Sequence, residues 1–118
     1  MVPTGRQLIQ SYGEGGFRVS DVAYQGSLLV FPEKIQAWAV TVCHDISINS
    51  LADAIGDSPL ILVIGCGATF MLPPKNLRTA LKDIGTSLEW MDTGAACRTF
   101  NVLLAEGRSA VTALIAVK

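Results

Sequence analysis

One stretch decides the fold, and it reads Met91-Asp-Thr-Gly-Ala-Ala-Cys-Arg-Thr-Phe-Asn-Val-Leu-Leu-Ala-Glu-Gly-Arg108. It predicts a short strand that runs into an amphipathic helix over residues 94–106, because apolar side chains recur at helical spacing. Asp92 or Thr93 can cap the start of this helix, and Gly107 ends it. Open α/β sheets place ligands at such strand-to-helix junctions, so this turn is the first candidate for a site.

The rest of the second half of the chain also alternates between predicted strands and helices. Leu60–Ile64 is a continuous apolar run, which is typical of a strand covered on both faces in a parallel sheet. Pro74 suits the first position of a helix that ends at Gly85. The stretches Ser87–Met91 and Ala110–Val117 have the pattern of further strands. The order predicts a β-α-β-α-β unit with right-handed crossovers.

The first half predicts antiparallel strands. Phe17–Val22 alternates apolar and polar side chains, and strands are expected at residues 26–31 and 37–43 after short connections. Ser50 is placed to cap a short helix over residues 51–55.

These elements predict one three-layer α/β domain with a mixed central sheet over residues 17–118. The C-terminal β-α-β-α-β half supplies one part of it, and the N-terminal antiparallel strands supply the rest. Residues 1–16 are polar and rich in glycine, so they predict a loose leader with room for one short strand.

The composition excludes several classes of function. The chain has 118 residues, of which 50% are hydrophobic and 16% charged, with a net charge of −1. No basic run is present, so we expect no nucleic-acid partner. A transmembrane segment needs ~20 consecutive apolar residues, whereas the longest uncharged window, Ser58–Pro74, is interrupted by glycine and proline. The start has no signal-peptide pattern, and the expected location is the cytoplasm of a bacterium.

The three cysteines, Cys43, Cys66 and Cys97, have no metal-binding spacing, and His44 is the only histidine. We therefore expect no metal site and no cofactor. Cys97 lies early in its helix, where the thiol pKa can be lowered, and it could pair with Cys66. The alternative is a small buried side chain. In Cys43-His44-Asp45 the histidine of a strand points away from its neighbours, so we expect no catalytic residue there.

The main candidate site is a crevice between the loop at Gly65, Cys66 and Gly67 and the turn at Asp92 and Thr93. If their strands are parallel neighbours, the two loops leave the same sheet edge, and the free N–H groups of the helix start could bind an anion. The alternative is that glycines only bend the chain and Asp92 or Thr93 only caps the helix. A dinucleotide fingerprint is a poor match, because Phe70 stands where its third glycine belongs.

Arg98 could add positive charge to this crevice. It shares one helix face with Asn101, and with Arg108 past the helix end the two could form a polar recognition patch. The equal alternative is that Asn101 ties the helix to a neighbouring loop through main-chain hydrogen bonds.

The whole pattern resembles a known family, over about Ile9 to Ile115. The residues that carry the resemblance are Trp38, Gly65, Gly67, Thr93, Ala96, Phe100, Asn101, Leu103, Gly107 and Val111. The family is the small single-domain one that includes mitochondrial complex I assembly factor three, the adipogenesis-associated domain protein and uncharacterised bacterial proteins. The sequence around Cys97, residues 92–101, is similar to that of the alphaproteobacterial branch of this family. Cys66 stands where threonine is frequent in relatives, and Phe100 where tyrosine is usual.

The resemblance implies a mixed α/β fold and no established enzymatic activity. Mitochondrial members help to assemble a membrane-bound respiratory complex, and bacterial members are often encoded near protein-export genes. We therefore expect a non-enzymatic interaction or assembly factor with a protein partner, including a membrane-associated complex, and self-association is compatible with the apolar composition. The alternative is a small-molecule or anion-binding domain that uses the crevice between residues 65–70 and 92–98.

Overall fold

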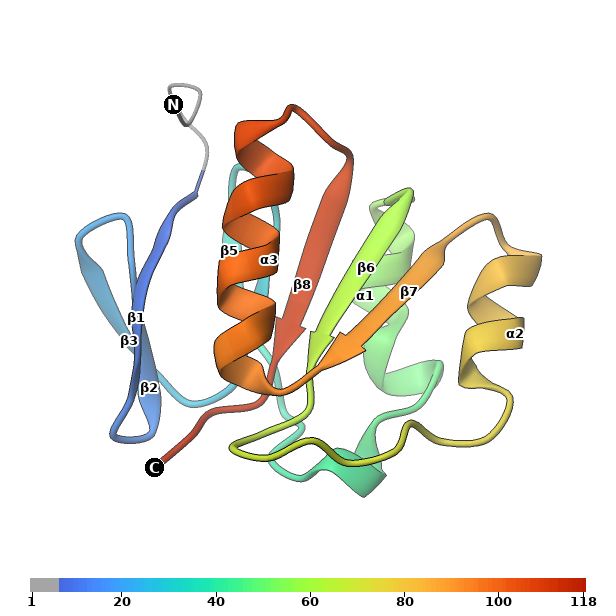
Figure 1. Cartoon of the computed structure of the whole chain (residues 1–118), viewed down its shortest axis with the longest axis horizontal. Coiled ribbons are helices and arrows are strands. Elements are labelled where there is room, and N and C mark those ends of the chain that lie inside the picture. The colour runs from blue at the N-terminus through green and yellow to red at the C-terminus, as the bar shows by residue number, and fades with distance from the viewer. Residues whose placement is uncertain (1–6) are drawn as a thin grey trace.

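The computed structural model describes residues 7–118, and it contains a five-stranded mixed sheet in the order β5-β4-β8-β6-β7 (Figure 1). Its strands are β4 (Leu28–Val30), β5 (Ile35–Ala37), β6 (Ile61–Gly65), β7 (Ser87–Met91) and β8 (Ala110–Leu114). The helices are α1 (Ala52–Gly56), α2 (Leu77–Asp83) and α3 (Thr93–Ala105), and two short 3₁₀ turns are η1 (Cys43–Asp45) and η2 (Asn49–Leu51).

The second half of the chain forms the predicted β-α-β-α-β unit. Strand β6 lies between β7 and β8 and is parallel to both, with Ile64 opposite Trp90 on one side and Ala113 on the other. All five residues of β6 are buried. The continuous apolar run at residues 60–64 therefore marks a central parallel strand, as expected.

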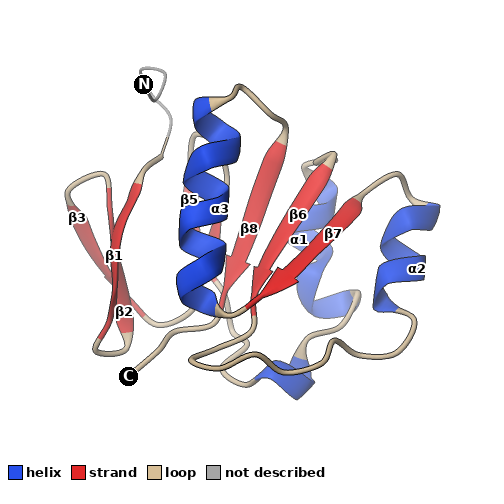
Figure 2. Cartoon of the chain, in the orientation of Figure 1, coloured by secondary structure: helices blue, strands red, loops and turns tan. Residues whose placement is uncertain are grey.

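Helices lie on both faces of this sheet, with α3 on one face and α1 on the other (Figure 2). Alternate residues of a strand point to opposite faces, so Val63 packs with Phe100 and Leu104 of α3. Leu62 and Ile64 pack on the other face, against the core residues of η2, α1 and α2, which are Leu51, Ala54, Leu77 and Leu81. This confirms the predicted three-layer α/β domain with a mixed central sheet.

A separate antiparallel sheet, β1-β2-β3, lies beside α3. It consists of β1 (Ile9–Gly13), β2 (Gly16–Val19) and β3 (Val22–Gln25). The prediction of one strand over residues 17–22 is wrong, because Ser20 and Asp21 have positive φ angles of 48° and 70°. Such a two-residue connection closes a tight hairpin.

The segment predicted as a leader contains strand β1. Ile9 is buried in the core cluster of α3, and β1 pairs along its length with β2. Residues 9–13 of the predicted leader thus form a strand, and residues 1–6 lie outside the described part of the chain.

The third predicted N-terminal strand, over residues 37–43, is also wrong. Strand β5 ends at Ala37, and the chain then leaves the sheet because the Trp38 side chain turns into the core and its indole N–H donates to the Ser50 carbonyl (2.7 Å). Ser50 makes no cap on α1. Its hydroxyl instead accepts from the Ser47 N–H (2.9 Å) and donates to the Ser47 carbonyl (3.0 Å).

Candidate functional site

The two loops of the predicted crevice lie against each other at the carboxyl edge of the sheet. Because β6 and β7 are parallel neighbours, residues 65–67 and the start of α3 leave that edge together. The Thr93 N–H donates to the Gly67 carbonyl (2.9 Å), and the Gly67 N–H donates to the Thr93 hydroxyl (3.1 Å). The two loops are therefore in direct contact here, and no open crevice lies between Gly67 and Thr93.

Thr93 closes the inner part of the crevice. Its side chain is fully buried, and its hydroxyl also donates to the Ile115 carbonyl (2.8 Å). A Cβ at Gly65 would lie 2.8 Å from the Thr93 Cα, so only glycine fits there. Gly65, Gly67 and Thr93, which the sequence predicts at one sheet edge, are packed against one another where β6, β8 and α3 meet.

Main-chain N–H groups at the start of α3 form hydrogen bonds with other groups of the protein. Asp92 is the N-cap, and its carboxylate accepts from the Ala95 N–H (2.9 Å). The Thr93 N–H is taken by Gly67. Two of the donors expected to attract an anion are thus already paired, which is the capping role that the sequence offered as the alternative.

Cys97, Arg98 and Asn101 face away from this joint, toward β1. They line a concavity of about 350 Å³ together with Gly94 and residues 9–12. The Asn101 amide accepts from the Ile9 N–H (2.9 Å) and donates to the Ile9 carbonyl (2.7 Å). Of the two roles that the sequence left open for Asn101, the structure therefore contains the main-chain tie.

Arg108 does not join this patch. It lies past the C-terminal end of α3, where its N–H donates to the Leu103 carbonyl (2.9 Å), and its guanidinium is 3.7 Å from the Glu106 carboxylate. Both side chains of this pair are 55% exposed. Arg108 and Arg98 line different concavities. The predicted patch of Arg98, Asn101 and Arg108 is therefore not brought together.

The two cysteines of the predicted crevice belong to different faces of the sheet. Cys66 packs in the cluster with α1 and α2, and Cys97 packs in the cluster with α3. Burial raises the pKa of Cys97 to about 12, which the neighbouring Arg98 lowers only in part. Cys97 is thus a protonated core side chain at neutral pH.

The neighbour of Cys66 is Cys43, which the sequence gave no reason to expect. Both thiols line a groove of about 540 Å³ between residues 41–44, residues 66–71 and the C-terminal residues 115–118. Burial, and then the adjacent Cys66 thiol, raise the pKa of Cys43. This groove lies at the carboxyl edge of the sheet, on the far side of the Thr93 joint from Arg98.

An apolar loop borders the groove. Phe70, Met71 and Leu72 are consecutive, and their exposed fractions are 58%, 53% and 81%. The Trp90 indole N–H donates to the Met71 carbonyl (2.6 Å), which holds the loop against the edge strand β7. The sequence signal for this surface is the Phe-Met-Leu triplet followed by Pro73 and Pro74, because two prolines disfavour continuing the segment into a helix or strand.

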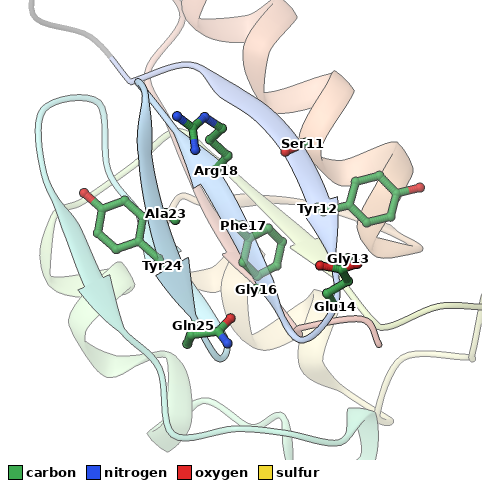
Figure 3. A pocket seen from close by; sticks show the side chains of 10 residues that line it. All are labelled: Ser11, Tyr12, Gly13, Glu14, Gly16, Phe17, Arg18, Ala23, Tyr24 and Gln25. Atoms are coloured by element: carbon green, nitrogen blue, oxygen red, sulfur yellow. The ribbon is translucent and has the colours of Figure 1, made fainter.

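A further concavity, of about 430 Å³, lies on the three-stranded sheet (Figure 3). Ser11, Arg18 and Ala23 are exposed cross-strand neighbours there. Figure 3 shows the Tyr12 side chain directed toward α3, with Arg18 and Glu14 at opposite ends of the surface. Because its single cation and single anion are separated, this surface has no concentrated charge.

The chemistry available to the groove is limited. The His44 side chain is 84% exposed, and its Nε2 is 3.6 Å from the carboxylate of the adjacent Asp45. Within residues 7–118, no three His, Cys, Asp or Glu side chains gather closely enough to hold a metal ion. None of the helices formed by these residues has both the length and the apolar character needed to cross a membrane.

Comparison with known proteins identifies similar chains. Residues 9–115 match the family model described as protein of unknown function (DUF498/DUF598). An uncharacterized protein of Rhodobacter capsulatus is 35% identical, over 91% of this chain and 82% of that protein. NADH dehydrogenase (ubiquinone) 1 alpha subcomplex assembly factor 3 of Danio rerio is 37% identical, over 92% of this chain. The aligned part is only 63% of that assembly factor's length.

A solved structure has the same fold. The crystal structure of a protein of Bartonella henselae, described as an outer membrane protein, superposes with a TM-score of 0.84 at 37% sequence identity. The superposition covers 100% of both chains. The similarity thus extends over the five-stranded sheet, its helices and the small β1-β2-β3 sheet alike.

Proposed function

The chain belongs to the DUF498/DUF598 family of proteins of unknown function, and from this membership we propose that it is a non-enzymatic protein-interaction domain that assists the assembly of other proteins. Its eukaryotic relatives are described as NADH dehydrogenase assembly factors. We extend only the general role, binding to proteins during assembly, to this chain. A respiratory complex or a protein-export system, including a membrane-associated one, is the kind of assembly we propose, with the bacterial cytoplasm as the location.

The apolar loop is the observation that carries this proposal. Scattered exposed apolar residues are ordinary, but a contiguous exposed apolar patch marks an interaction site. Phe70, Met71 and Leu72 are all more than half exposed. Other large apolar side chains near them, such as Leu77 and Trp90, are buried in the core. The contact between Trp90 and the Met71 carbonyl fixes the loop main chain in place. A surface fixed before binding loses less conformational entropy when a partner docks.

The groove extends the apolar surface. Val42, which is 41% exposed, and Met71 both line it. A partner segment with one or two large apolar side chains would fill the groove while its flanks cover Phe70 and Leu72. Interfaces of this kind draw most of their binding free energy from a few such anchors.

A catalytic function has weaker support. The only histidine, His44, is 84% exposed and lies 3.6 Å from the carboxylate of the adjacent Asp45, and burial raises the pKa of Cys97 in α3. A general base must lie within hydrogen-bond reach of the group it activates. No described nucleophile and base stand in that relation, which supports an interaction role.

The test is affinity capture of the tagged protein from native lysate and detergent-solubilised membrane, with quantitative mass spectrometry. A loop variant carries Phe70→Ser and Leu72→Ser. A control variant carries Leu60→Ser and Val102→Ser, which removes two apolar side chains that are 64% and 55% exposed elsewhere. We expect one or more partners to be retained by the wild type and the control and lost by the loop variant.

The captured partner is then purified and titrated against all three proteins after circular dichroism has shown equal folding. Truncating interface anchors should weaken binding by about 2 kcal/mol, or roughly 30-fold in Kd, in the loop variant alone. Equal weakening in the control, or no specific partner for any version, would contradict the proposal. Self-association lost only in the loop variant, measured by light scattering, would identify a second copy as the occupant.

A further inference from the structure

Two cysteines that are far apart in the sequence meet in the floor of the groove. Cys43 begins η1 and Cys66 follows the end of β6. Both line the groove, and Cys43 packs against the core cluster that contains Cys66. The Cys66 thiol is near enough to Cys43 to contribute, after burial, to the raised pKa of Cys43. The Cys66 sulfur is also held by the loop main chain, because it accepts from the Met71 N–H (3.4 Å) and donates to the Thr69 carbonyl (3.5 Å).

We propose that Cys43 and Cys66 form a reversible disulfide, with hydrogen peroxide as the oxidant. Cys43 is half-buried and borders the groove, so a small peroxide reaches it from solvent. Cys66 is only 3% exposed and lines the same groove. This arrangement supplies an accessible thiol that reacts first and a second thiol that resolves the product.

The reaction balances with peroxide alone. The Cys43 thiolate attacks one peroxide oxygen, the O–O bond breaks, and the departing hydroxide takes up the proton released from the thiol, which leaves a sulfenic acid and one water. The Cys66 thiolate then attacks the sulfenic sulfur. The S–O bond breaks as the S–S bond forms, and the hydroxide leaves as a second water with the Cys66 proton. Two thiols are oxidised and one peroxide is reduced.

The disulfide would join two walls of the groove. The chain around Cys43 is held by local hydrogen bonds, from the Asp45 N–H to the Val42 carbonyl (3.1 Å) and from the Ile46 N–H to the Cys43 carbonyl (3.1 Å). Strand β6, in contrast, is the central strand of the sheet's parallel portion. An S–S bond would therefore fix the position of residues 42–44 relative to a rigid strand. This inference does not depend on the protein-interaction function, because it needs only the two thiols and the oxidant.

The experiment treats the reduced full-length protein with hydrogen peroxide at mildly alkaline pH, since only the thiolate reacts and His44 and Lys118 are the other titratable groups lining the groove. Free thiols are counted after denaturation, and peptides are mapped under non-reducing conditions. We expect the count to fall from three to one, with a linked peptide that joins Cys43 to Cys66. Dithiothreitol should restore all three thiols.

Three variants make the result specific. Cys97→Ala should still form the link and lose both remaining thiols, whereas Cys43→Ser and Cys66→Ser should form no intramolecular link. The wild-type peptide map decides the matter even if a variant folds poorly. A link that includes Cys97, disulfides only between molecules, or oxidation to sulfinic acid without any link would overturn the proposal.

Discussion

The Thr93 hydroxyl connects two strands to one helix. It accepts a hydrogen bond from the Gly67 N–H and donates one to the Ile115 carbonyl, and the residue is completely buried. A buried main-chain group that loses its hydrogen-bond partner carries a desolvation cost. The Thr93 hydroxyl avoids this cost for both the Gly67 N–H and the Ile115 carbonyl. This single side chain explains why the junction is a joint rather than an open site.

We expect Thr93→Val to lower the free energy of unfolding by about 2 kcal/mol or more, because valine keeps the shape but leaves both main-chain groups unpaired. Urea denaturation measures the change. Thr93→Ser, which retains the hydroxyl and loses one methyl group, should be closer to the wild type. A valine variant as stable as the wild type would refute this role.

The raised pKa of Cys97 predicts a dependence of stability on pH. In the unfolded chain the thiol ionises near its ordinary pKa of 9.0, and in the folded protein near 12. The folded state therefore keeps a proton that the unfolded chain releases, so this contribution is present below pH 9 and is lost as the pH rises toward 12.

Urea denaturation of the wild type and of Cys97→Ala over this pH range tests the expectation. The alanine variant lacks the ionising group but keeps every other titrating group. The stability difference between the two proteins should therefore shrink as the pH rises. A difference that stays constant from pH 8 to pH 11, two values chosen to bracket roughly the ordinary thiol pKa, would contradict it.

Strand β1 is fastened to α3 at the level of whole elements. The Asn101 amide pairs with both main-chain groups of Ile9, which imitates the exchange of hydrogen bonds between antiparallel strands. The Tyr12 ring approaches Gly94 so closely that a Cβ there would overlap the tyrosine oxygen. Helix α3 thus presents one amide and one glycine to β1, and the small sheet docks through them.

We expect Asn101→Asp to destabilise this docking, because a carboxylate still accepts from the Ile9 N–H but faces the Ile9 carbonyl with no donor. The loss should be about 1–3 kcal/mol, with faster amide hydrogen exchange in β1 and β2 than in β6. Val102→Ala, at an exposed neighbouring position on α3, serves as the control. If amide hydrogen exchange in β1 did not change, the hydrogen bonds between Asn101 and Ile9 would not be needed for docking.

At the scale of the whole molecule, the chain separates two kinds of surface. The α3 face of the sheet is covered by the helix and the three-stranded sheet, and the opposite face by α1, α2 and the segment from Trp38 to Leu51. The carboxyl edge between these layers is where the groove and the apolar loop meet. The candidate interaction surface thus arises where the coverage of the sheet ends.

Local pattern determined much of this architecture. The 60–64 run, the 87–91 strand and the helix that starts beside Asp92 were predictable, because burial on two faces, alternation and capping leave signatures within a few residues. Predictions failed where the local pattern was ambiguous. The alternation of residues 17–20 does not show that the strand ends before the Ser20-Asp21 turn, and the mostly apolar residues 38–43 match a strand although Trp38 turns inward.

By itself, then, the sequence determined the fold class and the central β-α-β-α-β unit. It also indicated that the loops at residues 65–67 and 92–93 leave the same sheet edge, since parallel strands bring their carboxyl ends to one edge. Only the tertiary structure decided which side chains face one another across that edge. It placed Cys66 beside Cys43 instead of Cys97, separated Arg108 from Arg98, and left Phe70–Leu72 exposed. The reason is physical: side-chain direction within an element follows from periodicity, but contact between elements depends on how layers pack and on where loops cross the sheet edge.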